Sequence, residues 1–446
     1  MERRRKGFTY TQTIAFSFVA IIFIGAVILS LPISSRSGEW TNFVDSLFTA
    51  TSATCVTGLV VYDTCLHWSL FGQTIILLLI QIGGLSFMTV ITMFSIFVGK
   101  TIGLHERRLL MQSAGTIRYT GIIKLIKQIV MLTVLFEGVG ALLLFVRFYP
   151  ELGLAKGLYY AVFHSVSAFC NAGFDLMGYR GEFSSLISFA DDVFVNLTIM
   201  FLIFAGSLGF LVWTNLIKKR FRFKELDLHA KIVVTVTVIL IVSGALLIYI
   251  FEADNAFAHL NGPGKVMGAF FQSIATRTAG FGTVDQAALS PSGSLVSMML
   301  MFIGGSPGST AGGIKTTTFA VLFINAVTYA RNENGINIFK RKISSDTAKQ
   351  AAAIFGVHFI FMLAATIIIC AVEHVELMEC LYETVSAIST VGYSMGLTPG
   401  FSDVSLIVLC VLMYAGRIGG LSFMLTFAEK RKRVQIERPE EKIIIG

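Results

Sequence analysis

The chain has 446 residues, of which 54% are hydrophobic and only 14% are charged, and its mean hydropathy is +0.75. About a quarter of the residues of a soluble domain are charged, so this composition excludes a soluble globular protein. The net charge of +8 would suggest a nucleic-acid partner in a soluble protein. Here the basic residues cluster between apolar runs, which argues against that partner.

Several apolar runs are long enough to cross a bilayer, which takes roughly 20 residues. They include residues 13–33, 71–99 and 230–251. The first run follows a basic start, "MERRRK", as the apolar part of a signal peptide does. It is too long for that role, lacks a small-residue cleavage site and precedes many more spans, so we interpret it as the retained first helix of a multi-pass membrane protein.

The basic residues predict the topology. Most of the 35 Lys and Arg residues lie in five segments, residues 3–6, 100–127, 218–231, 331–349 and 430–442. The positive-inside rule places such segments in the cytoplasm, so both termini are expected there. The segments delimit four blocks that begin on the same side of the membrane, with approximate boundaries at 1–100, 101–220, 221–335 and 336–446.

Each block contains an apolar helix, a shorter semi-polar helix that ends in Ser or Thr, a turn with glycine and a second apolar helix. Repetition at a fixed period indicates a repeat architecture. The turns read "TCVTGL", "FCNAGF", "TRTAGF" and "STVGYS", with glycines about 110 residues apart. The run "QIGGLSFM" at 81–88 returns as "RIGGLSFM" at 417–424, which would put Arg417 in the place of Gln81.

The fourth turn contains Thr-Val-Gly-Tyr, the order found in potassium-channel filters, where four loops surround an ion with backbone carbonyls. Glycine suits such a turn because left-handed backbone angles cost it little. A short helix that ends at the turn would point the negative end of its dipole at the ion path. Helix-breaking glycines at interhelical contacts are the alternative, but four in register favour a filter. The predicted ion-binding residues are Val56, Thr57, Gly58, Asn171, Ala172, Gly173, Thr278, Ala279, Gly280, Thr390, Val391 and Gly392.

The second apolar helix of the third block is interrupted. Ten residues from 304 to 313 include five Gly, one Pro and three hydroxyl residues, which cannot continue a helix. Such a segment inside a membrane must line water or be buried in protein, and we expect it to act as a gate below the filter. "GGIKTT" also suggests a nucleotide-binding loop, but Ile314 separates the glycine from the lysine and the context is a membrane span. The predicted gate residues are Gly304, Gly305, Ser306, Pro307, Gly308, Ser309, Thr310, Ala311, Gly312, Gly313, Lys315 and Arg417.

Two cations bear on the gate, Arg417 and, as a second contributor, Lys315, and both lie in apolar surroundings. A central intramembrane arginine costs roughly 2.5 to 3.5 kcal/mol and needs polar partners. We expect Arg417 to donate hydrogen bonds to the 304–313 segment and to repel ions from a closed pore. The alternative is that Arg417 braces packing through a carboxylate, Glu137 or Glu383. For Arg277, beside the third turn, bracing the loop is favoured over direct repulsion of ions.

The six cysteines carry no metal-ligand spacing. Cys55, Cys170, Cys370 and Cys410 fall in or beside apolar segments, where cysteine serves as a small buried apolar side chain. Cys55 and Cys65 could form a bridge, although nothing in the sequence requires one. We expect no cofactor in this chain.

These features resemble the Trk/Ktr/HKT superfamily of potassium transporters, and most of all the KtrB-type membrane subunits of bacterial Ktr uptake systems. The resemblance covers about residues 10–430 and rests on the four turns, the paired "IGGLSFM" runs and the interrupted third repeat. It implies an all-α, pseudo-fourfold, channel-like membrane fold with eight transmembrane helices. Each repeat would supply an outer helix, a re-entrant pore helix with a filter loop, and an inner helix.

The resemblance also implies function and partners. It implies potassium uptake, in some members with sodium, by a transporter that is not an enzyme. It implies a homodimer in the cytoplasmic membrane of a bacterium, on a cytosolic ring of KtrA-type regulatory subunits that bind the nucleotide. The basic runs at 218–224 and 340–345 suit an acidic partner or anionic lipid, and the tail ending in "EKIIIG" would dock on the second copy.

Two other classes compete with a gated potassium pore. A coupled secondary transporter would show inverted repeats and a midplane carboxylate, whereas these four units begin on the same side. A membrane enzyme would need a nucleophile with its base, or a metal cluster, and the sequence of the spans suggests neither. Because three turns depart from the channel sequence, we expect weaker discrimination against sodium than in a homotetrameric channel. The sequence leaves open whether sodium is required and which nucleotide controls opening.

Overall fold

The computed structural model describes residues 9–85, 89, 122–332, 335–419 and 423. The regular elements of the described chain are helices and one hairpin, in which β1 (Asn337–Ile338) pairs antiparallel with β2 (Arg341–Lys342). Isolated bridges join Ser35 to Trp68 and Ile303 to Ile314. Short 3₁₀ turns lie at Pro32–Ser34, Met177–Tyr179, Ile187–Phe189, Phe223–Glu225, Gln286–Ala288 and Thr398–Gly400. The expected mostly helical fold is confirmed.

Four helices in the described residues are long and apolar enough to cross a membrane. They are α1 (Tyr10–Ser30), α6 (Ile122–Cys170), α9 (Leu228–Glu252) and α13 (Ser345–Glu373). One lies in each of the four blocks. Their outer faces carry exposed apolar side chains such as Phe23, Leu142, Ile250 and Ile367, and such a belt indicates contact with lipid.

The second apolar helix of each block is shorter or broken. These helices are α3 (Leu70–Leu85), α7 (Val193–Leu208) with α8 (Phe210–Lys218), α11 (Pro291–Phe302) with α12 (Thr316–Ala330), and α15 (Asp403–Ile418). The α7 and α8 axes differ by 93°. The bend falls at Gly209, whose φ of 91° and ψ of 141° are not helical and favour glycine.

The short helices before the glycine turns lie in the buried centre. Three of them are separate, α2 (Phe43–Cys55), α10 (Gly262–Ala275) and α14 (Leu377–Ser389). The fourth, expected from Leu158, is joined to the outer helix within α6 across a kink. The kink lies at Gly153, whose φ is 73° and ψ is −175°, shortly after Pro150.

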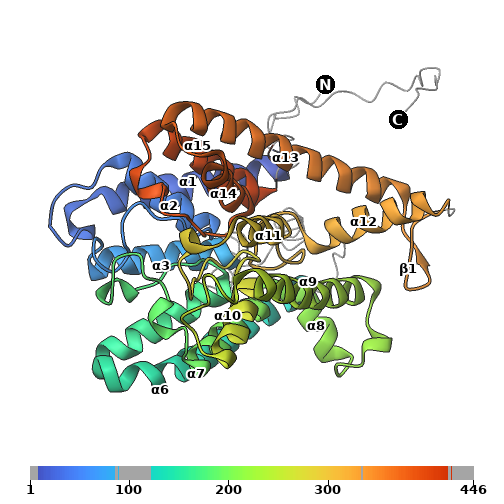
Figure 1. The fold of residues 1–446 in the computed structure, drawn as a ribbon, viewed down its shortest axis with the longest axis horizontal. Helices are drawn as coiled ribbons and strands as arrows, with labels where there is room; N and C mark the ends of the chain where they lie inside the picture. The colour runs from blue at the N-terminus through green and yellow to red at the C-terminus, as the bar shows by residue number, and fades with distance from the viewer. Residues whose placement is uncertain (1–8, 86–88, 90–121, 333–334, 420–422, 424–446) are drawn as a thin grey trace, which may run out of the picture.

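The chain closes on itself. Figure 1 shows the blue first block and the red fourth block side by side, and α2 packs against α15. The Tyr414 hydroxyl of α15 donates to the carbonyl of Ala15 in α1 at 2.8 Å. Consecutive blocks pack through α3 with α6 and through α7 with α10, so the four blocks surround a common centre.

In the third block and in the fourth block, a Glu and a Ser side chain join the two apolar helices of that block. Glu252, at the end of α9, accepts hydrogen bonds from the backbone N–H of Ser290 at 3.0 Å and from its hydroxyl at 2.6 Å. Glu373, at the end of α13, accepts the same two bonds from Ser402 at 3.0 and 2.5 Å. The same contact therefore recurs at the corresponding place in the third and fourth blocks.

Candidate functional site

The four turn glycines lie next to one another where the short helices end. A Cβ atom placed on Gly58 would lie 2.5 Å from the carbonyl oxygen of Ala172, and one on Gly173 would lie 2.8 Å from that of Ala279. A Cβ atom on Gly280 would lie 2.5 Å from the Val391 carbonyl oxygen, and one on Gly392 would lie 2.2 Å from that of Thr57. This last contact returns to the first turn and closes the ring. Four segments far apart in sequence therefore surround one point.

The backbone has the same unusual form in all four turns. The residue two positions before each glycine is left-handed, with φ of 58° at Val56, 62° at Asn171, 71° at Thr278 and 51° at Thr390. Three of these residues are β-branched, for which positive φ is a strained conformation. Such strain costs about 1–3 kcal/mol per residue and concentrates at functional sites, which supports a role for these turns.

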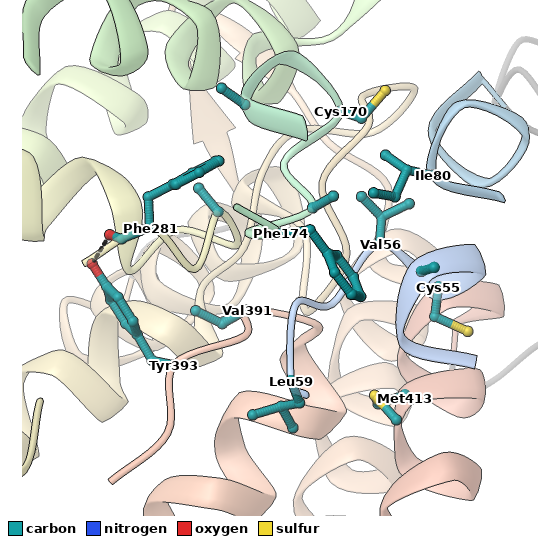
Figure 2. Close-up of a cluster of buried hydrophobic side chains, with 14 of the residues drawn as sticks. Cys55, Val56, Leu59, Ile80, Cys170, Phe174, Phe281, Val391, Tyr393 and Met413 are labelled. Carbon is teal, nitrogen blue, oxygen red and sulfur yellow. Dashed lines mark hydrogen bonds between the residues drawn. The ribbon is translucent and has the colours of Figure 1, made fainter. Parts of the chain in front are cut away.

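The side chains that follow the glycines pack behind the turns. Figure 2 shows them around the four turns as Leu59, Phe174, Phe281 and Tyr393, and all four are buried. The helices end close before the turns, at Cys55 for α2, Cys170 for α6, Ala275 for α10 and Ser389 for α14. The partial negative charge of each helix carboxyl end therefore lies near the ring.

Two serines hold turn glycines in place. The Ser52 hydroxyl accepts the Gly58 N–H at 3.0 Å, and the Ser386 hydroxyl accepts the Gly392 N–H at 3.1 Å. Ser167 occupies the same place before the second glycine, but its hydroxyl donates to a neighbouring carbonyl. These serines were not predicted from the sequence. The signal available was a serine six positions before the glycine in three of the four turns.

Ser386→Ala is expected to destabilise the fourth turn. It leaves the half-buried Gly392 N–H without its acceptor, at a cost of about 1 kcal/mol. We expect a lower midpoint of thermal unfolding in detergent. Ser46→Ala is the matched control, because Ser46 is also buried in a short helix and its hydroxyl has no partner in the described structure. Equal midpoints for the two variants would contradict this role.

A second brace lies behind two of the turns. Glu383 accepts the Met395 N–H at 3.0 Å and the Thr398 hydroxyl at 2.8 Å. In the second block His164 accepts the Leu176 N–H at 3.3 Å through Nε2. Glu383 and His164 each lie nine residues before their glycine. Glu383 therefore holds the loop that follows its own turn.

The interrupted segment lies directly against the turns. The helix α11 ends at Phe302 and α12 begins at Thr316, so the expected break is present. A Cβ atom on Gly312 would lie 1.9 Å from the Thr390 hydroxyl. The Thr310 hydroxyl donates to the carbonyl of Phe169 at 3.1 Å, at the end of the second short helix. The segment thus contacts the second and fourth blocks at the level of the turns.

Arg417 connects this segment to the first block. Its Nη1 donates to the carbonyl of Thr310, and its Nη2 donates to the carbonyl of Gly83 at 2.6 Å. Lys315 folds back on the same segment, where its Nζ donates to the Ala311 carbonyl at 2.6 Å. Both cations are therefore bound to backbone carbonyls.

The carboxylates considered as alternative partners of Arg417 have other partners. Glu137 accepts from Gln81 Nε2 at 3.3 Å. The four ion pairs among the described residues do not include Arg417. Arg277 is buried and donates from Nη2 to the Gly304 carbonyl at 3.3 Å, so it contacts the interrupted segment.

The alignment of Arg417 with Gln81, expected from the sequence, is wrong by three residues. A Cβ atom on Gly83 would lie 2.0 Å from the carbonyl of Thr54, four residues before the first turn glycine. The corresponding contact in the fourth block, at 2.0 Å to the carbonyl of Ile388, is made by Gly416. Arg417 therefore corresponds to the residue after Gly83, and not to Gln81.

A cavity of about 440 Å³ lies on the side of the ring opposite the interrupted segment. All four turn glycines line it, together with Asp63, Asp175 and Asp285. Desolvation raises the pKa of Asp175 to about 7, and the neighbouring Asp63 carboxylate contributes to the rise. The mouth of the ring is thus acidic, which favours cations.

The structure adds little evidence for other chemistry. In the part of the chain that the structure describes, no cluster of three His, Cys, Asp or Glu residues could hold a metal ion. All six cysteines are free, so Cys55 and Cys65 do not form the bridge considered from the sequence. The tail and most of the 100–127 segment lie outside the described residues.

The comparison with known proteins decides the family. Residues 6–436 match the family described as TrkH, cation transport protein. The chain belongs to the TrkH family. This confirms the resemblance seen in the sequence and makes the protein an ion transporter and not an enzyme.

Relatives of this TrkH-family chain span nearly its full length. It is 37% identical to the potassium/sodium uptake protein NtpJ of Enterococcus hirae, over 100% of this chain and 99% of the relative. It is also 37% identical to the Ktr system potassium uptake protein B of Bacillus subtilis, over 98% and 97%. The crystal structure of the potassium transporter TrkH from Vibrio parahaemolyticus superposes with a TM-score of 0.73 at 16% identity, covering 96% of this chain and 87% of that one. The TrkH fold is therefore shared.

Proposed function

We propose that this protein is a gated pore for potassium uptake across the cytoplasmic membrane of a bacterium. The four turns form a pseudo-fourfold filter in a fold of eight transmembrane helices, four long outer ones and four shorter or broken inner ones. The closed ring of contacts from Gly58 to Ala172 and onward to Gly392 and Thr57 carries this proposal. The names of the relatives, potassium and potassium/sodium uptake proteins, support the choice of ion.

Passage through the ring requires an ion to exchange hydration water for protein oxygens. Backbone carbonyls at the turns supply these oxygens. The hydroxyls of Thr57 and Thr390, buried and without a partner in the described structure, add polar groups at the same level. An inside-negative potential of 100 mV supplies roughly 2.3 kcal/mol per unit charge, so uptake needs no hydrolysis of nucleotide by this chain.

The interrupted segment acts as the gate in this proposal. It lies below the ring, and Arg417 holds it through the carbonyl of Thr310. Its guanidinium also places a positive charge on the path, which repels a potassium ion. Opening requires the segment to move away from the turns and Arg417 to release that carbonyl.

The cytosolic side suits a regulatory partner. The loop between α8 and α9 and the β1–β2 hairpin meet through the rings of Phe223 and Phe339, 6.1 Å apart. Both loops are rich in Lys and Arg, so they form a continuous basic surface. We propose that a homodimer of this chain contacts a KtrA-type nucleotide-binding ring there, and that sodium is a second ion of the system.

Uptake and growth test this function. We expect the chain, expressed with a Ktr-type regulatory subunit, to restore growth of a potassium-uptake-deficient bacterium on low potassium. We also expect the purified protein in liposomes to carry potassium down its gradient. Absence of both growth and flux from correctly folded protein would reject the proposal.

Potassium uptake is expected to depend on external pH through Asp175. Because its pKa is raised to about 7, the carboxyl is mostly charged at pH 8 and mostly neutral at pH 6. A charged mouth concentrates cations, so we expect the KM for potassium to be about threefold lower at pH 8 than at pH 6. Asp175→Asn should remove this dependence, whereas Asp254→Asn, at a fully exposed loop position, should keep it. A pH dependence that persists in Asp175→Asn would contradict this assignment.

A further inference from the structure

We propose that a buried polar network between the third and fourth turns sets their spacing and is a determinant of potassium over sodium selectivity. The inference rests on the proposed function of the turns as a filter. The network consists of four side chains, Gln272, Gln286, Tyr382 and Tyr393, and is called here the glutamine–tyrosine tether.

Tyr393 joins the two turns directly. It follows the fourth filter glycine, and its hydroxyl donates to the carbonyl of Phe281 at 2.7 Å, as Figure 2 shows. Phe281 follows the third filter glycine, Gly280. The bond therefore links equivalent positions of two neighbouring repeats, one residue beyond the ring.

Two glutamines support this bond from behind. Gln272, in the third short helix, lies with its Oε1 3.2 Å from the Tyr393 hydroxyl, and its Nε2 donates to Gln286 Oε1 at 2.6 Å. Gln286 also donates to the Val284 carbonyl at 2.9 Å and accepts from the Tyr382 hydroxyl at 2.9 Å. The tether thus runs from α14 through the loop of the third block and back to the fourth turn.

The tether is buried and fully bonded. The exposed fractions are 0% for Gln272, 6% for Gln286, 0% for Tyr382 and 2% for Tyr393. Buried polar networks whose members are all satisfied rigidify a structure, because any displacement leaves a desolvated polar group without a partner. The tether therefore resists movement of one turn relative to the other.

The tether is specific to this junction. The positions equivalent to Tyr393 are Leu59, Phe174 and Phe281, and the positions equivalent to Gln272 are Ala50, Ser165 and Thr384. None of these residues can form the same bonds. The fourth turn, the one with Thr-Val-Gly-Tyr, is therefore tied to its neighbour by a hydroxyl that the other turns lack.

Selectivity is sensitive to such a link. Discrimination between two cations in a filter depends on the arrangement of the carbonyls that replace the hydration shell of the ion. A tenfold change in selectivity corresponds to about 1.4 kcal/mol, which is within the range of one buried hydrogen bond. Loss of the tether should therefore let the third and fourth turns close around sodium.

The test compares three variants in liposomes that contain the regulatory subunit. Tyr393→Phe removes only the hydroxyl, and we expect the potassium-to-sodium permeability ratio to fall about three- to tenfold while potassium flux continues. The double variant Gln272→Leu with Gln286→Leu removes both amides together and should lower the ratio in the same direction. Tyr62→Phe is the control, because the Tyr62 hydroxyl bonds Asp45 within its own block at 2.7 Å, and its ratio should equal that of the wild type.

The outcomes separate the tether from the proposed function and from a general effect on folding. The inference is overturned if Tyr393→Phe and the double variant both keep the wild-type ratio, or if Tyr62→Phe lowers it equally. A wild-type protein that carries no potassium in this assay instead rejects the proposed function. Thermal unfolding midpoints of all variants are measured in parallel, and a ratio that falls at an unchanged midpoint identifies a role in selectivity beyond stability.

Discussion

Gly392→Ser is expected to lower the potassium-to-sodium permeability ratio by about tenfold or more. The added Cβ would lie 2.2 Å from the Thr57 carbonyl oxygen, so two adjacent turns must move apart. The backbone φ of 97° at Gly392 adds about 1–2 kcal/mol of strain for an L-residue. Since 1.4 kcal/mol is a factor of ten, a displacement of the carbonyls at this cost is enough to remove most of the discrimination.

Gly396→Ser is the matched control for this variant. Gly396 lies in the same turn region and has a φ of 90°, but no atom lies within 4 Å of a Cβ placed there. It carries the backbone strain without the clash, and its permeability ratio should remain that of the wild type. The filter assignment fails if serine at Gly58, Gly173, Gly280 and Gly392 in turn leaves the ratio unchanged.

Arg417→Ala is expected to raise potassium flux about tenfold in the absence of an activating partner. The guanidinium bonds the Thr310 carbonyl of the interrupted segment and the Gly83 carbonyl of the first block. Hydrogen bonds from a charged donor contribute about 1.5–3 kcal/mol, so their loss shifts the segment toward the displaced state by a factor of ten or more. Deletion of residues 306–312 should act in the same direction with a larger effect.

Two further variants show which property of Arg417 matters. Arg417→Lys keeps the positive charge but loses the two-pronged donor, so it should open the gate less than alanine does. Arg331→Ala removes an exposed arginine at the end of α12 and should leave flux unchanged. Wild-type flux in both Arg417→Ala and the 306–312 deletion would show that this segment is not a gate.

The glycines of the four turns could be predicted from sequence because the backbone geometry there restricts the residue type. At Gly58 a side chain would collide with the Ala172 carbonyl, and φ is 97°, so only glycine fits. The interrupted segment could be predicted for a similar reason, since glycine and proline between 304 and 313 remove helix bonds whatever surrounds them. Residue types that constrain the backbone can therefore be recognised in a single sequence.

The partners of the polar side chains were harder to predict. Ser386 and Tyr393 act through bonds to backbone atoms of loops, and any hydroxyl near the right place would look the same in sequence. The partner of Arg417 is likewise a carbonyl, which every residue possesses. Long-range packing, and not residue type, selects these contacts.

The repeat alignment failed for a related reason. The runs at 81–88 and 417–424 share seven identical residues. These identities suggested an alignment that the packing of the helices contradicts. The contact with the short helix needs a single small residue, which Gly83 provides in one block and Gly416 in the other. Identical residues in the two runs therefore do not occupy equivalent positions along their helices.

The location of a bound ion tests the central claim most directly. Crystals of the full chain soaked in rubidium would show anomalous scattering wherever a potassium-like ion resides. We predict a peak on the axis between the carbonyls of Thr57, Ala172, Ala279 and Val391, coordinated by all four blocks. Ordered turns with no peak between them, and rubidium bound elsewhere in the protein, would contradict a filter built from one chain.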